Sequence, residues 1–356
     1  MKNKITGIMS ACLLASIAVG CAQSADKKAI TATGDRFAFV EDAANHKIDI
    51  LLDGKPYTSY LYADSLKKAV LYPLRTKGDH FITRGWPVVP RANERTDHPH
   101  HIGLWFNYGD VNGLDFWNNS TAISPEKRMH YGSIQHAKVN ALESHDNEGT
   151  LDVSKYWLGP EGDSLMLEET KYIFQVLPDS STSIVLDVKL KALKDLSFKD
   201  NKEGLIGIRL ARELEHPSDK PATFTDANGV ATTVEKADNT GVTGRYISSE
   251  GKEGDDVWGT RGNWVNLNGT IEGEKVSLLI IDHPKNPGYP TYWHARGYGL
   301  FAANPLGQKE FSKGKEELNF KLAKGESTEF RYEVVIHSGS NLDAIAAGKL
   351  AESFSK

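Results

Sequence analysis

The chain has 356 residues, a formal net charge of -5 and only two cysteines, Cys12 and Cys21. The charge comes without a basic cluster, which argues against nucleic acid as a partner. Because both cysteines lie at the N-terminus, the rest of the chain must fold through its core alone, as a chain of this length can. Beyond the N-terminus, no apolar run is long enough to cross a bilayer as a helix.

The first residues have the pattern of an export signal. Lys2 and Lys4 precede an apolar run that ends near Val19, which is typical of a secretory signal. Small residues directly before Cys21 are typical of a lipoprotein cleavage site, with the Cys21 thiol as the point of lipid attachment. Cleavage of an ordinary signal a few residues later is the alternative.

These features predict three segments: a lipoprotein signal peptide over residues 1–20, a tether over residues 21–29 and one domain over residues 30–356. We expect the domain to face the periplasm of a Gram-negative bacterium and to contact a membrane only through a lipid anchor. No linker, charge block or repeat of fixed period divides the domain.

Short runs of alternating apolar and polar residues recur between turn signals throughout the domain. They predict an all-β fold, a large antiparallel β-sandwich. Helical spacing occurs only over residues 342–354, which predicts a short C-terminal helix. The main expected strands are residues 37–40, 47–52, 57–62, 100–108, 133–143, 150–158, 165–176, 183–192, 204–213, 243–247, 264–267, 275–282, 298–302, 317–322 and 328–337.

The stretch from Arg84 to Trp117 concentrates side chains used in proton transfer, metal ligation and sugar binding. Its centre reads HPHHIGLWFN over residues 98–107. If residues 100–108 form a strand, alternation sends one set of side chains to the core and the other to a site. The core set is Ile102, Leu104 and Phe106, and the site set is His101, Trp105 and Asn107.

The three histidines leave three roles open. In extended backbone His98 and His100 share a face and could bind one divalent metal ion, with His101 opposite. General acid/base work or substrate contact is a second role, because imidazole titrates near neutral pH. Anchoring a loop by hydrogen bonds is the third. Without a third ligand at fixed spacing, the metal signal is weak, and no other cofactor is predicted.

Four arginines, Arg84, Arg209, Arg261 and Arg296, lie among aromatic residues and glycines. A planar guanidinium can bind the carboxylate of an oxidised or uronic sugar through two hydrogen bonds. We favour that role for Arg84 and Arg296. Arg209 fits equally well an ion pair with Glu213 that braces the sandwich.

A second polar stretch follows an expected apolar strand. Asp282 and His283 end that strand, and Trp293, His294 and Arg296 come soon after. Aromatic rings flanked by carboxylate, imidazole and guanidinium groups suit the C–H faces and hydroxyls of a sugar. Each tryptophan alone is better explained by the core, whereas the whole pattern favours a site.

Residues 97–106 and 109–117 resemble the PmoA-like family, exported proteins of unknown function. Tyr72-Pro73-Leu74, Asp282-His283-Pro284 and Trp293-His294 fit the same pattern, and the resemblance covers nearly the whole mature chain. The family name points to a methane oxygenase subunit, but such subunits are membrane-embedded. The resemblance implies a fold, a supersandwich with a galactose-mutarotase-like arrangement as one candidate, and by analogy a use on polysaccharides and glycosides.

The leading hypothesis is an exported carbohydrate-processing enzyme that acts on a modified glycoside or oligosaccharide by hydrolysis or elimination, with His and Asp transferring protons. A non-catalytic glycan-binding lipoprotein and a metal-dependent oxygenase with His98, His100 and Asp110 as ligands are the alternatives. The expected catalytic residues are His100, His101, Asp110, Asp282 and His283. The expected substrate-binding residues are Arg84, Trp105, Asn107, Asn112, Asp115, Trp117, Trp293, His294 and Arg296.

Replacement of Cys21 with Ser should release the protein from membranes, because it removes the thiol that would carry the lipid. Fractionation of cells that express wild-type and Cys21→Ser protein provides the measurement. Cys12→Ser is the matched control, since Cys12 lies inside the segment expected to be removed. Unchanged membrane association of the Cys21→Ser protein contradicts a lipid anchor.

Overall fold

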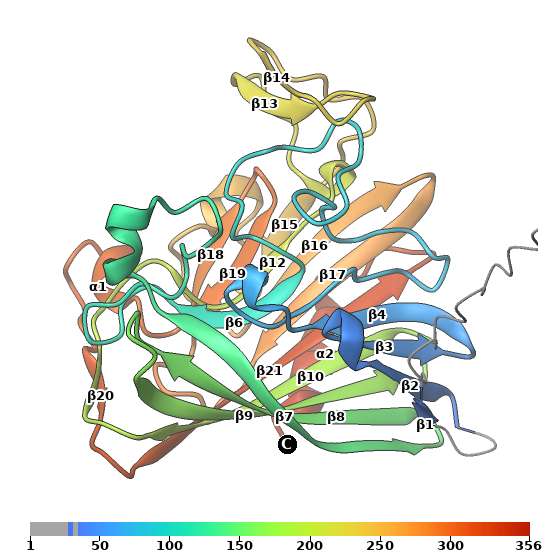
Figure 1. Cartoon of the computed structure of the whole chain (residues 1–356). Coiled ribbons are helices and arrows are strands. Elements are labelled where there is room, and N and C mark those ends of the chain that lie inside the picture. The colour runs from blue at the N-terminus through green and yellow to red at the C-terminus, as the bar shows by residue number, and fades with distance from the viewer. Residues whose placement is uncertain (1–27, 31–34) are drawn as a thin grey trace, which may run out of the picture.

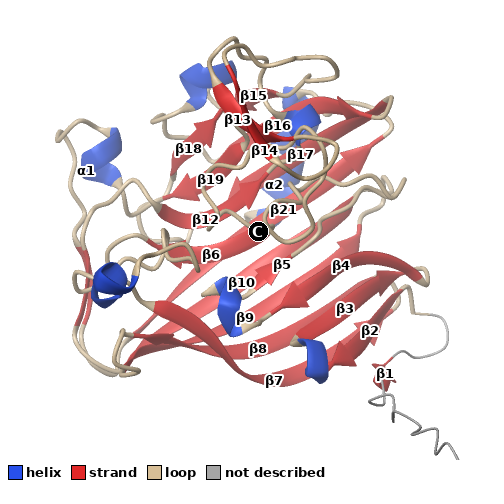
Figure 2. Cartoon of the chain, turned by 45° about the horizontal axis from the view of Figure 1, so that its top comes forward, coloured by secondary structure: helices blue, strands red, loops and turns tan. Residues whose placement is uncertain are grey.

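A computed structural model describes residues 28–30 and 35–356 of the chain. The expected signal peptide, Cys21 and most of the expected tether lie outside these residues. Two large antiparallel sheets pack face to face (Figures 1 and 2), which confirms the predicted β-sandwich. Within the described ranges, no helix combines the length and the apolar composition needed to span a membrane.

The first sheet has nine strands and the second has eight. Their orders are β1-β2-β3-β4-β5-β6-β12-β19-β18 and β15-β16-β17-β21-β10-β9-β8-β7, and β11 with β20 and β13 with β14 form two small sheets. The bounds are β1 Lys28–Ile30, β2 Phe37–Asp42, β3 Lys47–Leu52, β4 Lys55–Leu61, β5 Val70–Leu71, β6 Leu104–Tyr108, β7 Ser133–His145, β8 Glu148–Leu158, β9 Ser164–Val176, β10 Thr182–Ala192, β11 Leu196–Phe198, β12 Gly204–Arg209, β13 Ala222–Thr225, β14 Ala231–Val234, β15 Arg245–Ser248, β16 Trp264–Ile271, β17 Glu274–Asp282, β18 Tyr292–Arg296, β19 Leu300–Asn304, β20 Phe320–Leu322, β21 Ser327–Ser338, α1 Gln308–Phe311 and α2 Ala344–Phe354.

The main core lies between the two sheets, and β6 shows how alternation divides its side chains. Leu104 and Phe106 belong to this core, as predicted, whereas Trp105 packs on the opposite, outer face of the first sheet. Ile102 was expected with Leu104 but packs with Trp105. The reason is that the strand begins only at Leu104 and that Gly103 has a φ of +59°, which breaks the extended alternation.

The predicted C-terminal helix is confirmed as α2. Its N-cap residue, Asp343, accepts a hydrogen bond from the Ala346 N–H at 2.8 Å, which satisfies one of the free donors of the first turn. Ala347 and Ala351 pack on the outer face of the second sheet, against Leu279 and neighbouring apolar residues. The helix therefore covers the second sheet and leaves the outer face of the first sheet to loops.

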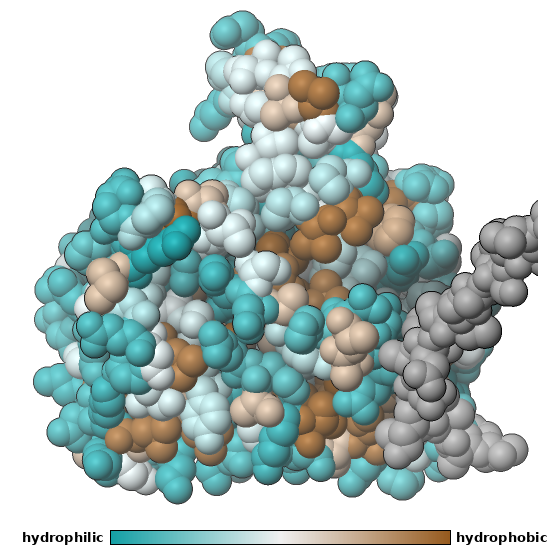
Figure 3. Space-filling model, viewed as in Figure 1, coloured by the Kyte–Doolittle hydropathy of each residue, from teal (hydrophilic) through white to brown (hydrophobic). Residues whose placement is uncertain are grey.

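Loops cover the outer face of the first sheet around β6 and β12. The segment between β5 and β6 is tied to the end of β12, because the Arg84 N–H donates to the Arg209 carbonyl at 3.0 Å. The hairpin of β13 and β14 projects from the body at the top of Figure 1, and hydrophilic residues cover most of the face shown in Figure 3. The outer face of the first sheet is thus one part of the described molecule where loops and strands together can form a site.

Gly207→Ala should destabilise the protein. Gly207 pairs with Trp105 across β12 and β6, and an added Cβ would lie 2.6 Å from Cζ2 of Trp105 and 3.0 Å from Cη2 of Trp117. Both rings are buried, so the substitution must move packed groups, at a cost of about 1–3 kcal/mol in the free energy of unfolding. Urea unfolding provides the measurement.

Gly348→Ala is the control for this prediction. Gly348 lies in the middle of α2, and an added Cβ there meets nothing within 4 Å. The better helix propensity of alanine should stabilise the protein by roughly 0.5–1 kcal/mol. Equal stability of wild-type and Gly207→Ala protein would contradict the close packing of Gly207 against the two tryptophans.

Candidate active site

Strand β18 brings two of the expected site residues to the outer face of the first sheet. Trp293 and Ala295 belong to the core between the sheets, so alternation turns His294 and Arg296 outward. The Trp293 indole N–H donates to the Gly262 carbonyl at 3.0 Å, and the ring is fully buried. Trp293 therefore anchors the strand and cannot serve as the sugar-binding platform that its sequence context suggested.

A cavity of about 440 Å³ lies beside this strand. That volume is within the usual range of small-molecule sites. The loop before β6, the segment before β12 and strand β18 all contribute to its wall. The lining residues are His98, His100, His101, Asn118, Lys202, Glu203, Trp258, His294, Arg296 and Tyr298.

Four rings form one stacked column that leads from this cavity into the sheet. Tyr298 stacks on His98 with centroids 5.2 Å apart, His98 on His101 at 4.8 Å, and His101 on Trp105 at 5.2 Å. The column exists because residues 98–101 form a turn, in which the His101 N–H donates to the His98 carbonyl at 3.0 Å and His98 has a φ of +48°. The predicted extended strand from His100 onward is therefore wrong for these residues.

Within this turn, His101 has a different environment from His98 and His100. His101 is only 2% exposed. Trp117 Nε1 donates to its Nε2 at 3.2 Å, and Arg209 Nη1 lies 3.3 Å from its Nδ1. Burial, together with the charges of His100 and Arg209, lowers the pKa of His101 well below its usual value. Because both ring nitrogens face protein groups, His101 positions its neighbours and is not free to exchange protons with a substrate.

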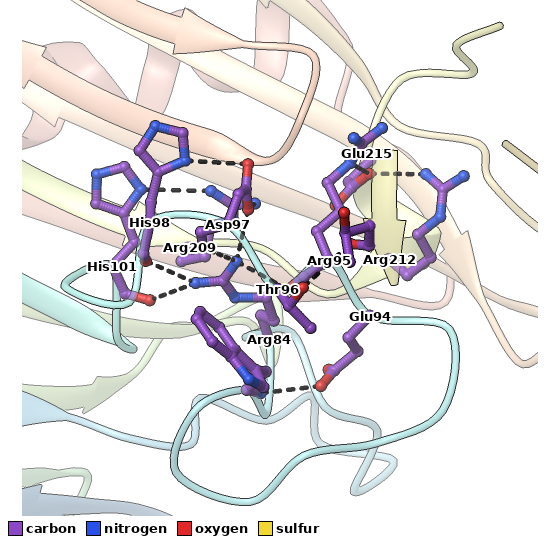
Figure 4. Close-up of polar contacts among 12 residues, drawn as sticks. Arg84, Glu94, Arg95, Thr96, Asp97, His98, His101, Arg209, Arg212 and Glu215 are labelled. Atoms are coloured by element: carbon purple, nitrogen blue, oxygen red, sulfur yellow. Dashed lines mark hydrogen bonds and ion pairs between the residues drawn. The ribbon is translucent and has the colours of Figure 1, made fainter. Parts of the chain in front are cut away.

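Arg84 holds the histidine-bearing loop from below (Figure 4). Its guanidinium is buried and donates to the carbonyls of Arg95, Asp97, His98 and His101 at 2.8–3.1 Å, and to Asp97 Oδ1 at 2.9 Å. All these acceptors belong to the protein. Arg84 is thus a structural group, and the predicted contact with a substrate carboxylate is wrong.

Arg209 approaches the same carboxylate from β12. Its Nη2 donates to Asp97 Oδ1 at 2.5 Å, and its guanidinium carbon lies 5.0 Å from the centroid of the Tyr298 ring. The strand ends at Arg209, so Glu213 does not continue its face and the suggested Arg209–Glu213 pair does not form. Two buried guanidinium groups therefore share one carboxylate, Asp97.

Asp97 in turn orients His98. Burial alone raises the pKa of Asp97, but His98, Arg209 and Arg84 outweigh it and hold that pKa far below its usual range. The carboxylate is therefore ionised at neutral pH, with Oδ2 3.0 Å from His98 Nδ1. A carboxylate this close to a ring nitrogen restricts the orientation of the imidazole. His98 also lines the cavity.

His294 has the opposite environment. Its Nδ1 lies 3.0 Å from the Lys202 carbonyl, so Nδ1 carries the hydrogen and Nε2 carries the lone pair. Burial, followed by the charges of Lys202 and Arg296, lowers the pKa of His294 to about 3. Glu203 Oε2 lies 3.7 Å from the same Nδ1. His294 is therefore neutral at rest, with a carboxylate nearby to offset a charge that develops on it.

His100 is a second neutral imidazole of the cavity wall. Burial, followed by the charge of Lys68, lowers its pKa to about 2. Its Nε2 is buried and finds no hydrogen-bond partner within the described residues. Lys68 Nζ donates to the His100 carbonyl at 2.6 Å, which fixes the backbone of the turn.

Asp282 and His283 lie away from this cavity. His283 lines a separate cavity of about 420 Å³ with Asp187 and Arg331, two residues of the second sheet. Asp282 is buried, and its carboxylate accepts hydrogen bonds from Asn286 Nδ2 at 2.7 Å and the Thr291 N–H at 2.8 Å. Burial raises the pKa of Asp282 to about 7. Of the second polar stretch, only the part on β18 reaches the cavity with the histidines.

The remaining residues expected to bind substrate, together with Asp110, which was expected to be catalytic, hold the loops around β6. Trp105 and Trp117 are buried against each other, with ring centroids 5.2 Å apart. The polar members hydrogen-bond to nearby backbone groups. Asn107 donates to the Phe116 carbonyl, Asp110 accepts from the Gly113 N–H, Asn112 donates to the Asp195 carbonyl, and Asp115 accepts from the N–H groups of Trp117 and Asn118.

The predicted metal site does not take shape at His98 and His100. Their rings meet edge to face with centroids 5.7 Å apart, and Asp110 binds its own loop. Across residues 28–30 and 35–356, no group of three or more His, Cys, Asp or Glu side chains is arranged to hold a metal ion. The cavity also holds Trp258, one of the tryptophans whose sequence pattern favoured a site, and Glu203 and Tyr298, which were not predicted as site residues.

Comparisons with known proteins give a family and distant structural likenesses. The profile of a family of unknown function (DUF6807) matches residues 47–352. No curated protein matches the sequence. Similar solved structures include a galactose mutarotase related enzyme from Lactobacillus acidophilus (9% identity, TM-score 0.31), galactose 1-epimerase from Lactobacillus acidophilus NCFM (10%, 0.28) and the GalM/aldose epimerase homologue from C. elegans (8%, 0.29). They cover 89%, 89% and 90% of this chain and 100% of their own chains. At these TM-scores they assign neither a reaction nor a site.

Asp97→Asn should destabilise the protein at neutral pH and much less in acid. Because the folded-state pKa of Asp97 lies below the unfolded value of about 3.9, its ionised form contributes stability above that value. This contribution disappears as the pH falls through the folded-state pKa. The difference in unfolding free energy between wild type and variant should therefore be largest near pH 7 and shrink steadily below pH 4, as urea unfolding across the pH range will show.

Asp53→Asn provides the control for Asp97. Asp53 also has a lowered pKa, caused first by its hydrogen bond with Arg36, but its side chain is 48% exposed. Solvent-exposed pairs contribute little, so this variant should change stability by less than about 1 kcal/mol at pH 7. A pH-independent difference for Asp97→Asn would contradict the role of its charge.

Proposed function

The chain belongs to the DUF6807 family of unknown function, and we propose that the cavity beside His98 and His294 is the active site of a carbohydrate-processing enzyme. The observation that carries this proposal is the convergence of His98, Glu203 and His294 on one cavity from three separate segments of the chain. Two imidazoles in different environments allow one ring to donate a proton to the substrate and the other to accept a proton.

His98 and His294 divide the work of acid and base. His98, whose Nδ1 lies 3.0 Å from the carboxylate of Asp97, donates a proton to the oxygen of a leaving group. His294 holds a lone pair at Nε2 and accepts a proton, either from water or from a carbon made acidic by a neighbouring carbonyl. Hydrolysis follows in the first case and elimination in the second. Glu203 offsets the positive charge that forms on His294.

The aromatic residues of the cavity support a sugar as substrate. Trp258 and Tyr298 are partly exposed and line the same wall as the imidazoles and the carboxylate of Glu203. Apolar ring faces beside polar groups match the C–H faces and hydroxyls of a pyranose. A non-catalytic glycan-binding protein would use the same wall, and it differs from an enzyme in having no need of histidine protonation.

Two further proposals concern the setting of this enzyme. The N-terminal pattern supports export and attachment to a membrane through lipid on Cys21. The resemblance of the histidine stretch supports a relation to the PmoA-like exported proteins, with whom this chain would share a role in polysaccharide or glycoside use.

His294→Gln and His98→Gln should each lower turnover by about 10²- to 10⁴-fold. Glutamine keeps much of the volume and some hydrogen bonding of histidine but transfers no proton near neutral pH. Turnover on a panel of glycosides, uronides and keto-sugars provides the measurement, with thermal unfolding of each variant beside it. The melting temperature should stay near that of the wild type for His98→Gln, since its side chain is 40% exposed.

His283→Gln is the matched control, because His283 lines the separate cavity on the second sheet. Its turnover should equal that of the wild type. If His283→Gln loses turnover while His294→Gln and His98→Gln retain it, the active site lies elsewhere. If all three variants bind sugar normally and the wild type turns over nothing on the panel, the protein is a glycan-binding module.

A further inference from the structure

Arg296 stands at the boundary between two cavities. It lies at the end of β18 and lines both the cavity of the histidines and a neighbouring cavity of about 600 Å³. Trp258 and Tyr298 are shared by the two cavities in the same way. The two cavities thus share one cation and two aromatic rings in their linings.

The guanidinium of Arg296 is held by rings and not by a carboxylate. Its central carbon lies 5.3 Å from the Trp258 ring centroid and 5.9 Å from that of Tyr298. Within the described residues it forms no ion pair or hydrogen bond, in contrast to Arg84 and Arg209 behind it. Contacts with ring faces hold a guanidinium in place while its N–H edge stays available to a planar oxyanion.

The acidic side chains that line the two cavities already have other partners: Asp97 pairs with Arg84 and Arg209, and Asp219 pairs with Lys236. Glu203 pairs with Lys202 in the cavity of the histidines. Asp255 lies 3.1 Å from His216 Nδ1 in the neighbouring cavity. Arg296 is therefore a cation that the protein orients without neutralising, and an anionic ligand would supply the missing charge.

We propose that the substrate carries a carboxylate, as in a uronic or otherwise oxidised sugar, that Arg296 binds at the boundary, and that the substrate extends from there into both cavities. This inference rests on the proposed function, since it names the substrate class of the same site. Each cavity alone has the volume of a small-molecule site. Together they accommodate two linked sugar units, with the carboxylate near the linkage and His98 and His294 on one side of it.

The test compares three disaccharides that differ at one carbon: a uronide, its neutral counterpart with a hydroxymethyl group, and the sulfate ester of the neutral counterpart. Calorimetric titration measures the binding of each to the full-length protein. Wild-type protein should prefer the uronide over the neutral sugar by about 10- to 100-fold, the usual strength of hydrogen bonds to a charged group. The sulfate ester should bind more weakly than the uronide, because a carboxylate is planar and matches two N–H groups.

Arg296→Gln should abolish the preference for the uronide and leave binding of the neutral disaccharide nearly unchanged. Arg296→Lys should retain part of the preference, since lysine keeps the charge but not the planar fork. Arg245→Gln is the matched control. Arg245 is exposed, pairs with Glu253 and lines neither cavity, so its replacement should leave the preference intact.

Three results would overturn the inference: equal affinity of the wild type for uronide and neutral sugar, tighter binding of the sulfate ester than of the uronide, or an uronic acid monosaccharide that binds as tightly as the disaccharide. None of these three binding results tests the proposed catalytic roles. Those roles are tested by the turnover of His98→Gln and His294→Gln on whichever sugar the wild type converts. Conversely, full turnover in those variants removes the proposed function while a uronide preference lost in Arg296→Gln would still establish the carboxylate site.

Discussion

The burial of Arg84 and Arg209 beneath one loop is the constraint on which the cavity depends. Taking two guanidinium groups out of water is costly unless each donor finds an acceptor. Asp97 supplies one negative charge for both, and backbone carbonyls of residues 95–101 satisfy most of the remaining donors of Arg84. The loop cannot rearrange without leaving a buried charge unpaired. The position of His98 is therefore set by charges under the loop and not by the strand that follows it.

The two faces of the first sheet serve different purposes because alternation separates them strictly. In β18, Trp293 and Ala295 extend the core while His294 and Arg296 face the cavity. In β6 and β12 the outer face carries Trp105 and Gly207, whose close contact supports the stacked column of rings. A rigid, fully paired sheet thus positions one half of the site, and a loop locked by ion pairs positions the other.

Sequence patterns predicted the parts of this structure that depend on local order. Regular alternation identified β10 and β21, a continuous apolar run identified β17, and helical spacing identified α2. The turn at residues 98–101 could be given only as an alternative to an extended strand, because it depends on Arg84, whose acceptors lie 11 to 17 residues along the chain. Strand β18 was missed because turn residues precede it. An arginine can bind backbone carbonyls in the interior or a substrate in a cavity, and the sequence pattern is the same in both cases. Only tertiary contacts distinguish the structural role of Arg84 from the proposed binding role of Arg296.

The same cation that is proposed to bind the substrate also acts on the proposed base. The charge of Arg296 contributes to the lowered pKa of His294, after burial and Lys202. A carboxylate bound to Arg296 would cancel this contribution, and the pKa of His294 would rise. A group with a higher pKa is a stronger base, so arrival of an anionic substrate would strengthen proton acceptance at Nε2. A neutral sugar would leave Arg296 without an ion pair, and His294 would remain a weak base. Recognition and proton transfer would then be coupled through one electrostatic contact, and the site would select its substrate in the chemical step as well as in binding.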